Sequence, residues 1–214
     1  MKGSLFITGA SGFIASNLLR KLNIKEYKSV YCLSRHESEI LTRLSEYDNF
    51  KFIKGSIYDA ELYEPYLASS DIVVHLAAAT GKAGREEYFK VNAEGTKFLI
   101  NQCIRQGVTK FLFISSISVK FPEVSQYYYA QSKQAAENIV KESGLNYTIL
   151  RPTIVIGKES PILRSLEKLA KMPVIPIFGT GTSQIQPIYI EDLVDCILYI
   201  INENNFMNYV IRNL

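Results

Sequence analysis

Short runs of apolar residues alternate along the first two thirds of the chain with segments in which apolar residues recur every three or four positions. The runs lie at residues 4–7, 29–33, 50–54, 71–79, 110–114 and 147–150. Runs of this length indicate buried strands, and the segments between them indicate amphipathic helices. The alternation predicts an α/β fold built on one doubly wound parallel sheet, spanning residues 1–152.

The segments between the runs predict helices of unequal length. We expect these helices at about residues 17–22, 59–67, 85–106 and 129–143. The segment 85–106 is strongly amphipathic, and it carries more large apolar residues than one buried face needs. We therefore expect part of its surface to be covered by something other than the sheet.

The pattern changes after residue 152, where the predicted elements become shorter and more varied. They are a helix at 163–171, an extended stretch at 172–178, a turn at 179–182, a strand at 188–190, a helix at 191–201 and a strand at 209–211. We expect residues 153–214 to form a small region that is interleaved with the sheet domain and covers the substrate side of its cleft.

Composition narrows the class of protein. The 214 residues are 47% hydrophobic and 21% charged, which suits a globular chain with an ample core. The net charge of +3, without a long basic run, argues against a nucleic-acid partner. No apolar run approaches the roughly 20 residues of a membrane span, and the first residues lack a leader pattern. We expect a cytoplasmic protein that does not associate with membranes.

Cysteine and histidine are sparse. Cys32, Cys103 and Cys196 lie far apart in apolar segments, which is typical of reduced core residues. Only two histidines are present and neither lies in a Cys/His cluster, so no metal site is expected. His75 lies inside the apolar run 71–79, where a neutral, hydrogen-bonded ring is a better interpretation than a catalytic acid.

A glycine-containing turn follows the first predicted strand. Gly9 and Gly12 are spaced as in a tight turn that brings backbone N–H groups close to an anion, and Ala15 leaves room for the next helix to lie on the sheet. The helix N-terminus that follows favours negative charge. A strand, a glycine turn and a helix in this order predict a Rossmann-type site for a dinucleotide cofactor.

The end of the second predicted strand carries Ser34 and Arg35. A fold of this kind that prefers NAD usually has a carboxylate at this point to bind the adenosine ribose. Here a guanidinium could pair with a 2′-phosphate instead, so the sequence favours NADP, with NAD as the alternative. An ordinary surface arginine is the competing interpretation.

The spacing Tyr-x-x-x-Lys occurs twice, at Tyr129/Lys133 and at Tyr47/Lys51. On a helix, residues four apart share a face, and an ammonium beside a phenol lowers the phenol pKa toward the range of acid–base catalysis. The spacing alone does not choose between the two pairs. Hydroxyls at Ser115, Ser116 and Ser118 follow the strand at 110–114, at a strand end where ligands bind in open sheets.

Seven segments together carry a more specific signal. They are Thr8-Gly9-Ala10-Ser11-Gly12-Phe13-Ile14, His75-Leu76-Ala77-Ala78, Val91-Asn92-Ala93-Glu94-Gly95-Thr96, Phe113-Ile114-Ser115-Ser116, Tyr129-x-x-x-Lys133, Leu150-Arg151-Pro152 and Ile188-Tyr189-Ile190-Glu191-Asp192-Leu193. In this order and spacing the chain resembles the extended short-chain dehydrogenase/reductases, which are NAD(P)-dependent epimerases, dehydratases and reductases of nucleotide sugars. The resemblance covers nearly every residue.

The resemblance implies roles for individual residues. Ser116 would orient the substrate oxygen, Tyr129 would be the acid/base, and Lys133 would lower the phenol pKa and hold the nicotinamide ribose. Thr80, Ser116 and Gln186 would contact the substrate. The implied cofactor contacts are Gly9, Ser11, Gly12, Phe13, Ile14, Ser34, Arg35, Ser56, Ile57, Leu76, Ala77, Ala78, Tyr129, Lys133 and Pro152.

The chain also departs from the family pattern. Ala15 replaces a third glycine, Ser56 stands where an Asp near the adenine is usual, and Lys120 stands where a Tyr is common. Gln186 falls about where nucleotide-sugar members often place an Arg on the substrate pyrophosphate, which weakens the inference to a nucleotide sugar. Ile117 and Ser118 replace the Asp-Glu pair of relatives that eliminate water, so 4,6-dehydration is not expected.

The resemblance predicts an oxidoreductase or epimerase acting on a sugar or nucleotide sugar, and the NADP-type features favour reduction of a keto-sugar. The alternatives are a nucleotide-sugar 4-epimerase with tightly held NAD and a non-catalytic NADP-binding scaffold or regulatory protein. The resemblance also implies a homodimer, in which the helices at 86–106 and 129–143 pair with their symmetry mates as a four-helix bundle. A thick monomer core is the alternative explanation for the apolar surface of 85–106.

Overall fold

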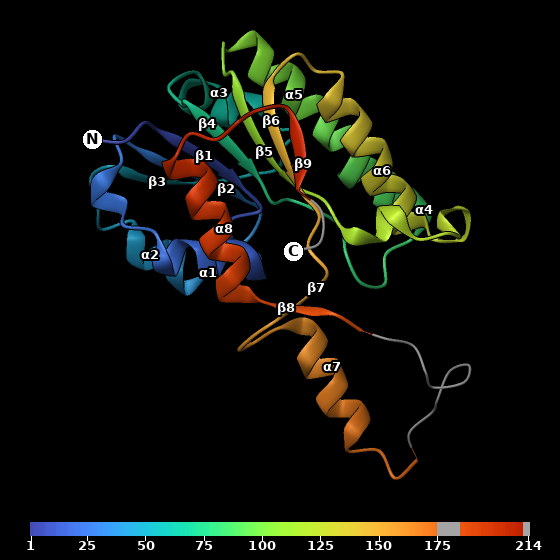
Figure 1. Cartoon of the computed structure of the whole chain (residues 1–214). Coiled ribbons are helices and arrows are strands. Elements are labelled where there is room, and N and C mark those ends of the chain that lie inside the picture. Colours follow the sequence, from blue (N-terminus) through green and yellow to red (C-terminus); the bar gives the residue numbers. More distant parts are fainter. Residues whose placement is uncertain (175–184, 212–214) are drawn as a thin grey trace.

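The computed structural model describes residues 1–174 and 185–211, and a seven-stranded, all-parallel sheet is the centre of this described part (Figure 1). Its strands lie in the order β3-β2-β1-β4-β5-β6-β9. Their bounds are β1 Leu5–Thr8, β2 Val30–Ser34, β3 Phe50–Lys54, β4 Ile72–His75, β5 Lys110–Ile114, β6 Asn146–Leu150 and β9 Tyr209–Ile211. The predicted doubly wound Rossmann fold is confirmed.

The central strands are apolar because helices cover both faces of the sheet. All residues of β1 and β4 are buried, and these two strands pair in register from Leu5↔Ile72 to Thr8↔His75. Strands covered on both sides lose the inside–outside alternation of a half-exposed sheet. This explains why the sequence presents them as continuous apolar runs.

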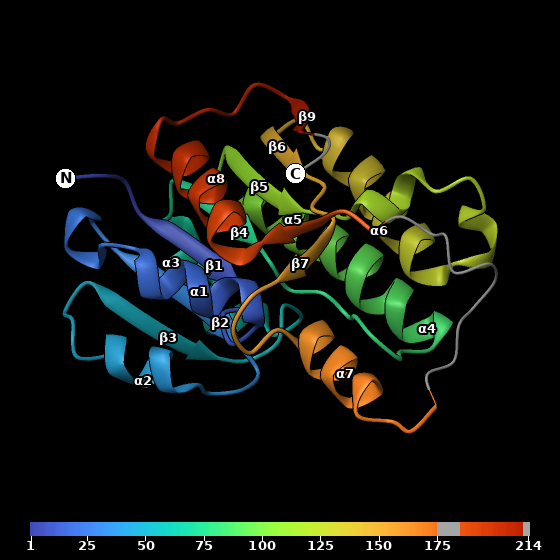
Figure 2. The ribbon, with the colours of Figure 1, turned by 60° about the horizontal axis from the view of Figure 1, so that its bottom comes forward.

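Helices form one layer on each face of the sheet (Figures 1 and 2). On one face, α1 Phe13–Lys21, α2 Glu39–Leu44 and α8 Ile190–Asn202 share a buried cluster with β1 and β2. On the other face, α3 Ala60–Ala68, α5 Gly95–Arg105 and α6 Tyr128–Lys141 share a second cluster with β4, β5 and β6. The sheet therefore separates two apolar layers, as the doubly wound architecture requires.

The segment expected to be one helix at 85–106 is divided. It consists of α4 Arg85–Tyr88, a π-helical segment Phe89–Glu94 and α5. A π-helical turn inserts an extra residue into the helix and is frequent at functional sites. The prediction of a single α-helix at 85–106 is therefore wrong. The side chain associated with the π-helical segment is described with the site below.

The C-terminal residues divide between the sheet and a peripheral unit. Helix α8 packs on α1, and β9 pairs with β6, so both belong to the sheet body. Strands β7 Ile154–Ile156 and β8 Pro187–Tyr189 form a separate two-stranded sheet, and α7 Pro161–Ala170 projects from it (Figures 1 and 2). No residue of α7 is buried.

Other expectations from the sequence are met in part. The apolar run 71–79 ends as a strand at His75, and β7 was not predicted. The predicted turn at 179–182 and most of the extended stretch 172–178 lie outside the described residues. The three cysteines are unpaired, and Cys32 and Cys103 are buried, as expected.

Two predicted absences can be compared with the described part of the chain. There, no helix combines the length and apolar character that a membrane span needs. No group of three or more His, Cys, Asp or Glu side chains within residues 1–174 and 185–211 could hold a metal ion.

Candidate active site

Two adjoining cavities lie at the carboxyl ends of the central strands. One is about 210 Å³ and the other about 460 Å³. Both are lined by Gly9, Gly12, Leu76 and Ala78, so they are parts of one cleft. The shared residues follow β1 and β4, where the strand order changes direction. In open α/β sheets this switch point is where ligands bind.

The glycine turn fits a close approach of backbone to a ligand. Gly9 has a φ of 66°, and a Cβ on it would lie 2.6 Å from the Ala77 backbone nitrogen. No other residue type would fit there without moving the chain, and position 9 also needs the left-handed conformation that glycine adopts freely. Helix α1 begins at Phe13, directly after this turn, so its positive end borders the cleft. The geometry matches a cradle for a pyrophosphate.

The smaller cavity contains the residues that follow β2 and β3. Ser34, Arg35 and His36 line it together with Ser56 and Ile57. The Ser34 hydroxyl lies 2.7 Å from the Ser11 hydroxyl and accepts a hydrogen bond from the His36 backbone N–H at 3.3 Å, which fixes the start of this loop. None of the described residues that line the cavity is acidic. A phosphate here would meet a guanidinium and no opposing carboxylate.

The larger cavity brings the expected catalytic residues together. Ser116, Tyr129 and Lys133 all line it, along with Thr80 and Pro152. Tyr129 and Lys133 lie one turn apart on α6, and Ser116 follows the end of β5. Tyr47 and Lys51 line neither cavity, so of the two Tyr-x-x-x-Lys pairs only Tyr129/Lys133 lines the cleft.

Lys133 is held deep in the protein. It is 2% exposed, its Nζ donates a hydrogen bond to the Ile114 carbonyl at 2.6 Å, and it lies 4.3 Å from the centre of the Phe113 ring. Burial lowers the pKa of Lys133 to about 7, and the Glu137 carboxylate opposes that fall. Lys133 therefore titrates near neutral pH, and the fraction that is charged depends on burial and on the neighbouring charges.

The phenol of Tyr129 differs from the expectation. Burial raises its pKa to about 12, the neighbouring Tyr127 and Tyr88 phenols add to the rise, and the Ser116 hydroxyl opposes it. The expected lowering by Lys133 is wrong for this structure, because the Lys133 Nζ is directed to the Ile114 carbonyl. The phenol is protonated near neutral pH, the form that can give a proton.

Two aromatic rings lie beside the Tyr129 ring. The Tyr127 and Tyr88 rings each lie 5.7 Å from the Tyr129 ring between centroids. Tyr127 also lines the larger cavity and is 44% exposed. Tyr127 is not among the site residues that the sequence predicts, because spacing along the chain does not show that it lies at the cleft.

Asn92 explains the π-helical segment. Its side-chain oxygen accepts from the Ala79 N–H at 2.7 Å, and its amide donates to the Ala79 carbonyl at 3.1 Å and to the Ser132 hydroxyl at 3.0 Å. The side chain thus holds the loop after β4 against α6. The π turn directs Asn92 to these long-range partners, and local periodicity cannot reveal them.

His75 has the structural role expected for it. It is fully buried, and its ring nitrogens lie 2.6 Å from the Thr8 hydroxyl and 3.0 Å from the Thr96 hydroxyl. Burial, with a smaller contribution from the Lys133 charge, lowers its pKa to about 3. His75 is therefore neutral at physiological pH.

The cleft gathers nearly all residues that the sequence proposed for it. Every proposed cofactor residue lines one of the two cavities, and so do Thr80 and Ser116. Gln186 lines neither of them and is exposed beside β8. Residues of the peripheral unit that the sequence did not propose also line the larger cavity, namely Ile154, Val155, Ser160, Pro161 and Ile162.

The sheet order, the glycine turn at the switch point and the Ser-Tyr-Lys arrangement define a dinucleotide-binding enzyme of the short-chain dehydrogenase/reductase class. Residues 5–211 match the NAD dependent epimerase/dehydratase family, and the chain belongs to that family. Its members are extended short-chain dehydrogenase/reductases, so the chain is an enzyme of this type.

Three similar proteins illustrate the family. The chain is 30% identical to a UDP-glucose 4-epimerase of Vibrio cholerae, over 98% of this chain and 70% of that protein. It is 30% identical to a dTDP-D-glucose 4,6-dehydratase of Mus musculus, over 93% of this chain and 64% of that protein. A UDP-glucuronic acid 4-epimerase of Bacillus cereus, solved with UDP-glucuronic acid and NAD, is 25% identical with a TM-score of 0.80, covering 97% of this chain and 76% of that one.

Proposed function

We propose that the chain is an NADP(H)-dependent reductase whose substrate is a keto-sugar, either a free sugar or a nucleotide sugar. The observation that carries the proposal is that Ser116, Tyr129 and Lys133 line one cavity that adjoins the nucleotide cavity. The close approach at Gly9 and the start of α1 beside it fit the pyrophosphate of a dinucleotide. A nicotinamide bound in the cleft would supply the hydride.

Side chains of the larger cavity would bind the carbonyl oxygen and protonate it. Ser116 would donate a hydrogen bond to that oxygen and hold it near the phenol. Tyr129 would transfer its proton to the oxygen as negative charge develops there, and its raised pKa keeps that proton available at neutral pH. Lys133, which donates to the Ile114 carbonyl and not to the phenol, would hold the nicotinamide ribose, and its charge, when present, would favour the phenolate that forms. Tyr127, Tyr88 and the apolar lining would exclude water from the reacting groups.

The preference for NADP rests on the smaller cavity. Arg35 lies there beside Ser34 and His36, and no described lining residue is acidic. A guanidinium forms charge-assisted hydrogen bonds with a phosphate, so a 2′-phosphate would gain a partner and meet no repelling group. The family description and the bound nucleotide of the Bacillus structure both name NAD, which keeps NAD as the alternative cofactor.

Epimerisation is the second candidate, since the Vibrio and Bacillus relatives are both 4-epimerases by name. An epimerase keeps its nicotinamide through oxidation and return, whereas a reductase exchanges it each turnover. The purified protein should therefore lose bound nicotinamide on gel filtration and should require added NADPH to reduce a keto-sugar. One bound nicotinamide per chain, with activity on a UDP-hexose and no added cofactor, would establish epimerisation instead.

Dehydration is not proposed, although the mouse relative is a 4,6-dehydratase by name. Elimination of water needs an additional acid and base beside the hexose, and Ile117 and Ser118 follow the catalytic Ser116 here. Incubation with nucleoside-diphosphate hexoses should therefore give no 4-keto-6-deoxy product. Detection of that product by mass spectrometry would contradict the assignment.

We also infer a homodimer through α4, α5 and α6. Exposed apolar and aromatic side chains on these helices support it, with Ile104 51% exposed and Tyr128 47% exposed. Arg85 lies over the rings of both Phe89 and Tyr128, which places a cation at the edge of this surface. Light scattering at micromolar concentration should give twice the mass of one chain, and the mass of a single chain would contradict the dimer.

A further inference from the structure

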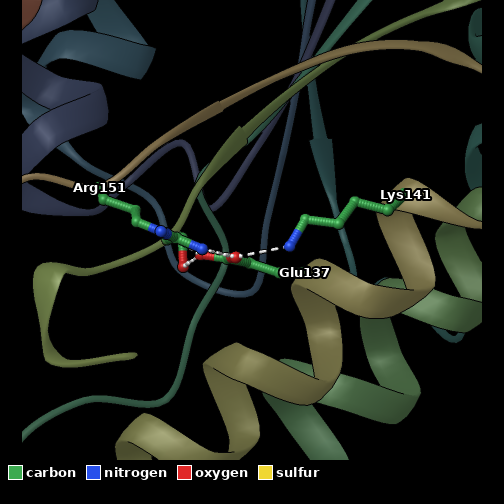
Figure 3. Close-up of polar contacts among 4 residues, drawn as sticks. Glu137, Lys141 and Arg151 are labelled. Carbon is green, nitrogen blue, oxygen red and sulfur yellow. Dashed lines mark hydrogen bonds and ion pairs between the residues drawn. The ribbon is translucent and has the colours of Figure 1, made fainter. Parts of the chain in front are cut away.

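A buried ionic cluster lies directly behind the catalytic residues and takes no part in the mechanism above. Glu137 of α6 and Arg151 at the end of β6 have side chains that are 1% and 6% exposed and form an ion pair. The Arg151 Nε donates to Glu137 Oε1 at 2.7 Å. The Ser115 hydroxyl donates to the same oxygen at 2.7 Å. Figure 3 shows the carboxylate between Arg151 on one side and Lys141 on the other.

This cluster is costly to bury and therefore needs an explanation. Two charges that are moved from water into the protein lose their solvation free energy, and their mutual attraction seldom exceeds this loss. A pair of apolar side chains of similar volume is often at least as stabilising. Glu137 also forms a second ion pair, in which the Nζ of the more exposed Lys141 lies 3.2 Å from Glu137 Oε2. The Arg151 side chain has one further nitrogen, Nη1, without a hydrogen-bond partner among the described residues. Stability alone does not account for this arrangement.

The position of Glu137 relates it to the catalytic residues. Tyr129, Lys133 and Glu137 follow one another at four-residue intervals on α6, so they lie along one face of the helix. Ser115 directly precedes Ser116, and Ile114, whose carbonyl accepts from Lys133, directly precedes Ser115. The carboxylate therefore joins the helix that carries Tyr129 and Lys133 to the strand end that carries Ser116.

We propose that Glu137 is a positioning residue for the catalytic centre: its buried carboxylate holds the Ser116 strand end against α6 and favours the charged form of Lys133. The proposal rests on the proposed function for the roles of Ser116, Tyr129 and Lys133. Glu137 itself touches neither substrate nor cofactor in this account. It acts through Ser115 on one side and through the charge of Lys133 on the other.

The charges around Lys133 support the electrostatic part of the proposal, in which Glu137 favours the charged form of Lys133. His75 of β4 faces it but is neutral, with a pKa lowered to about 3, and Tyr129 is protonated, with a pKa of about 12. The Phe113 ring of β5 presents its face to the ammonium. Glu137 is the carboxylate that opposes the burial of the Lys133 charge.

The carboxylate itself is ionised. Its burial would raise the pKa of Glu137, but hydrogen bonds from Arg151 and Ser115 and the charges of Arg151 and Lys141 lower it below the ordinary value. Glu137 therefore remains charged throughout the range in which Lys133 titrates. Removal of its charge should lower the pKa of Lys133 further, and less of Lys133 would then be charged at neutral pH.

The experiment measures Lys133 directly by NMR titration of its side-chain carbon next to Nζ, assigned by loss of the signal in Lys133→Arg. In Glu137→Gln, the titration midpoint of Lys133 should fall by about half a pH unit or more. The Lys141→Met variant is the matched control, because it removes the exposed partner of the same carboxylate and leaves the buried cluster intact. Its Lys133 midpoint should stay within about 0.2 pH units of the wild type.

If Glu137→Gln leaves Arg151 as an unpaired buried charge and prevents folding, the double variant Glu137→Gln/Arg151→Met removes both charges and should fold. A smaller fall in the Lys133 midpoint is expected there, because the double variant also removes the positive charge of Arg151. An unchanged midpoint in either folded variant would overturn the electrostatic part of the proposal. This readout needs no substrate, so it remains decisive even if the wild type fails to reduce any keto-sugar.

The positional part is tested separately with Ser115→Ala. This variant keeps the Glu137 charge, so the Lys133 midpoint should not move, but kcat should fall about tenfold with an unchanged Kd for the cofactor. An unchanged kcat would overturn the positional part. In Glu137→Gln, both the Lys133 midpoint and kcat at neutral pH should fall, because this variant loses both the carboxylate charge and the hydrogen-bond acceptor of Ser115.

Discussion

The sheet body and the peripheral β7-α7-β8 unit border the same cavity but are built in opposite ways. In the body, β1 and β4 are buried along their whole length, and helices cover both faces of the sheet. In the peripheral unit, α7 has no buried residue, although its apolar and polar residues are well separated around the helix. The residues proposed for the chemical step therefore come from the closely packed part of the protein.

The two regions are also expected to govern different properties of the enzyme. The body provides Ser116, Tyr129 and Lys133, the residues proposed for the chemical step. The peripheral unit provides Pro161 and Ile162 at the edge of the larger cavity. Since loosely packed segments open at low free-energy cost, we expect substrate choice to depend on the peripheral unit and the rate of the chemical step to depend on the body.

The largest effect is expected at the phenol. Tyr129→Phe removes the proton donor and should lower kcat/KM by about 10²- to 10⁴-fold, the usual contribution of general acid–base catalysis. Binding of NADP(H), measured by calorimetry, should change little. Tyr128→Phe is the matched control, because Tyr128 is the adjacent tyrosine, lines neither cavity and should retain full activity. Full turnover by Tyr129→Phe would remove Tyr129 from the mechanism.

The contrast in packing predicts a difference in stability between two leucines. Leu18 of α1 is fully buried in the body, and Leu166 of α7 is 47% exposed. Leu18→Ala leaves a cavity and should lower the free energy of unfolding by about 2–5 kcal/mol. Leu166→Ala should change it by no more than about 0.5 kcal/mol. Similar losses for the two variants in urea denaturation would show that α7 is packed as firmly as the body.

A smaller effect is expected at the cofactor end of the body. Loss of a charge-assisted hydrogen bond costs about 1.5–3 kcal/mol, which corresponds to roughly a tenfold to hundredfold change in affinity. NADP(H) should therefore bind at least about tenfold more tightly than NAD(H), and Arg35→Ala should remove most of this preference. Lys51→Ala, an exposed cation of β3 that does not line the cavity, is the control. Equal affinities in the wild type would refute the NADP assignment.

The sequence was most informative where local pattern and tertiary environment agree. The runs 50–54 and 110–114 became β3 and β5 with identical bounds. The reason is clearest for β5, where helices cover both faces and residues 111–114 are all buried and apolar. The glycine turn was equally readable, since the left-handed φ of Gly9 and its contact with the Ala77 backbone restrict position 9 to one residue type.

Features that depend on distant partners were not readable from local pattern. Asn92 lies in the π-helical segment that divides the helix expected at 85–106, and its hydrogen bonds reach Ala79 and Ser132, which are 13 and 40 residues away. The raised pKa of Tyr129 reflects burial and the direction of Lys133, which spacing alone does not give. Gln186 was placed by analogy with longer relatives, and the structure places it away from both cavities.

The central claim is that this cleft passes a hydride from NADPH to a keto-sugar while Tyr129 supplies the proton. The most direct measurement is mass spectrometry of products formed from nucleotide-linked 4-keto-hexoses with NADPH deuterated at the transferable position of the nicotinamide. The wild type should incorporate one deuterium per product molecule, and Tyr129→Phe should bind the cofactor but give almost no labelled product. Product formed by the wild type without deuterium from the added cofactor would contradict the account.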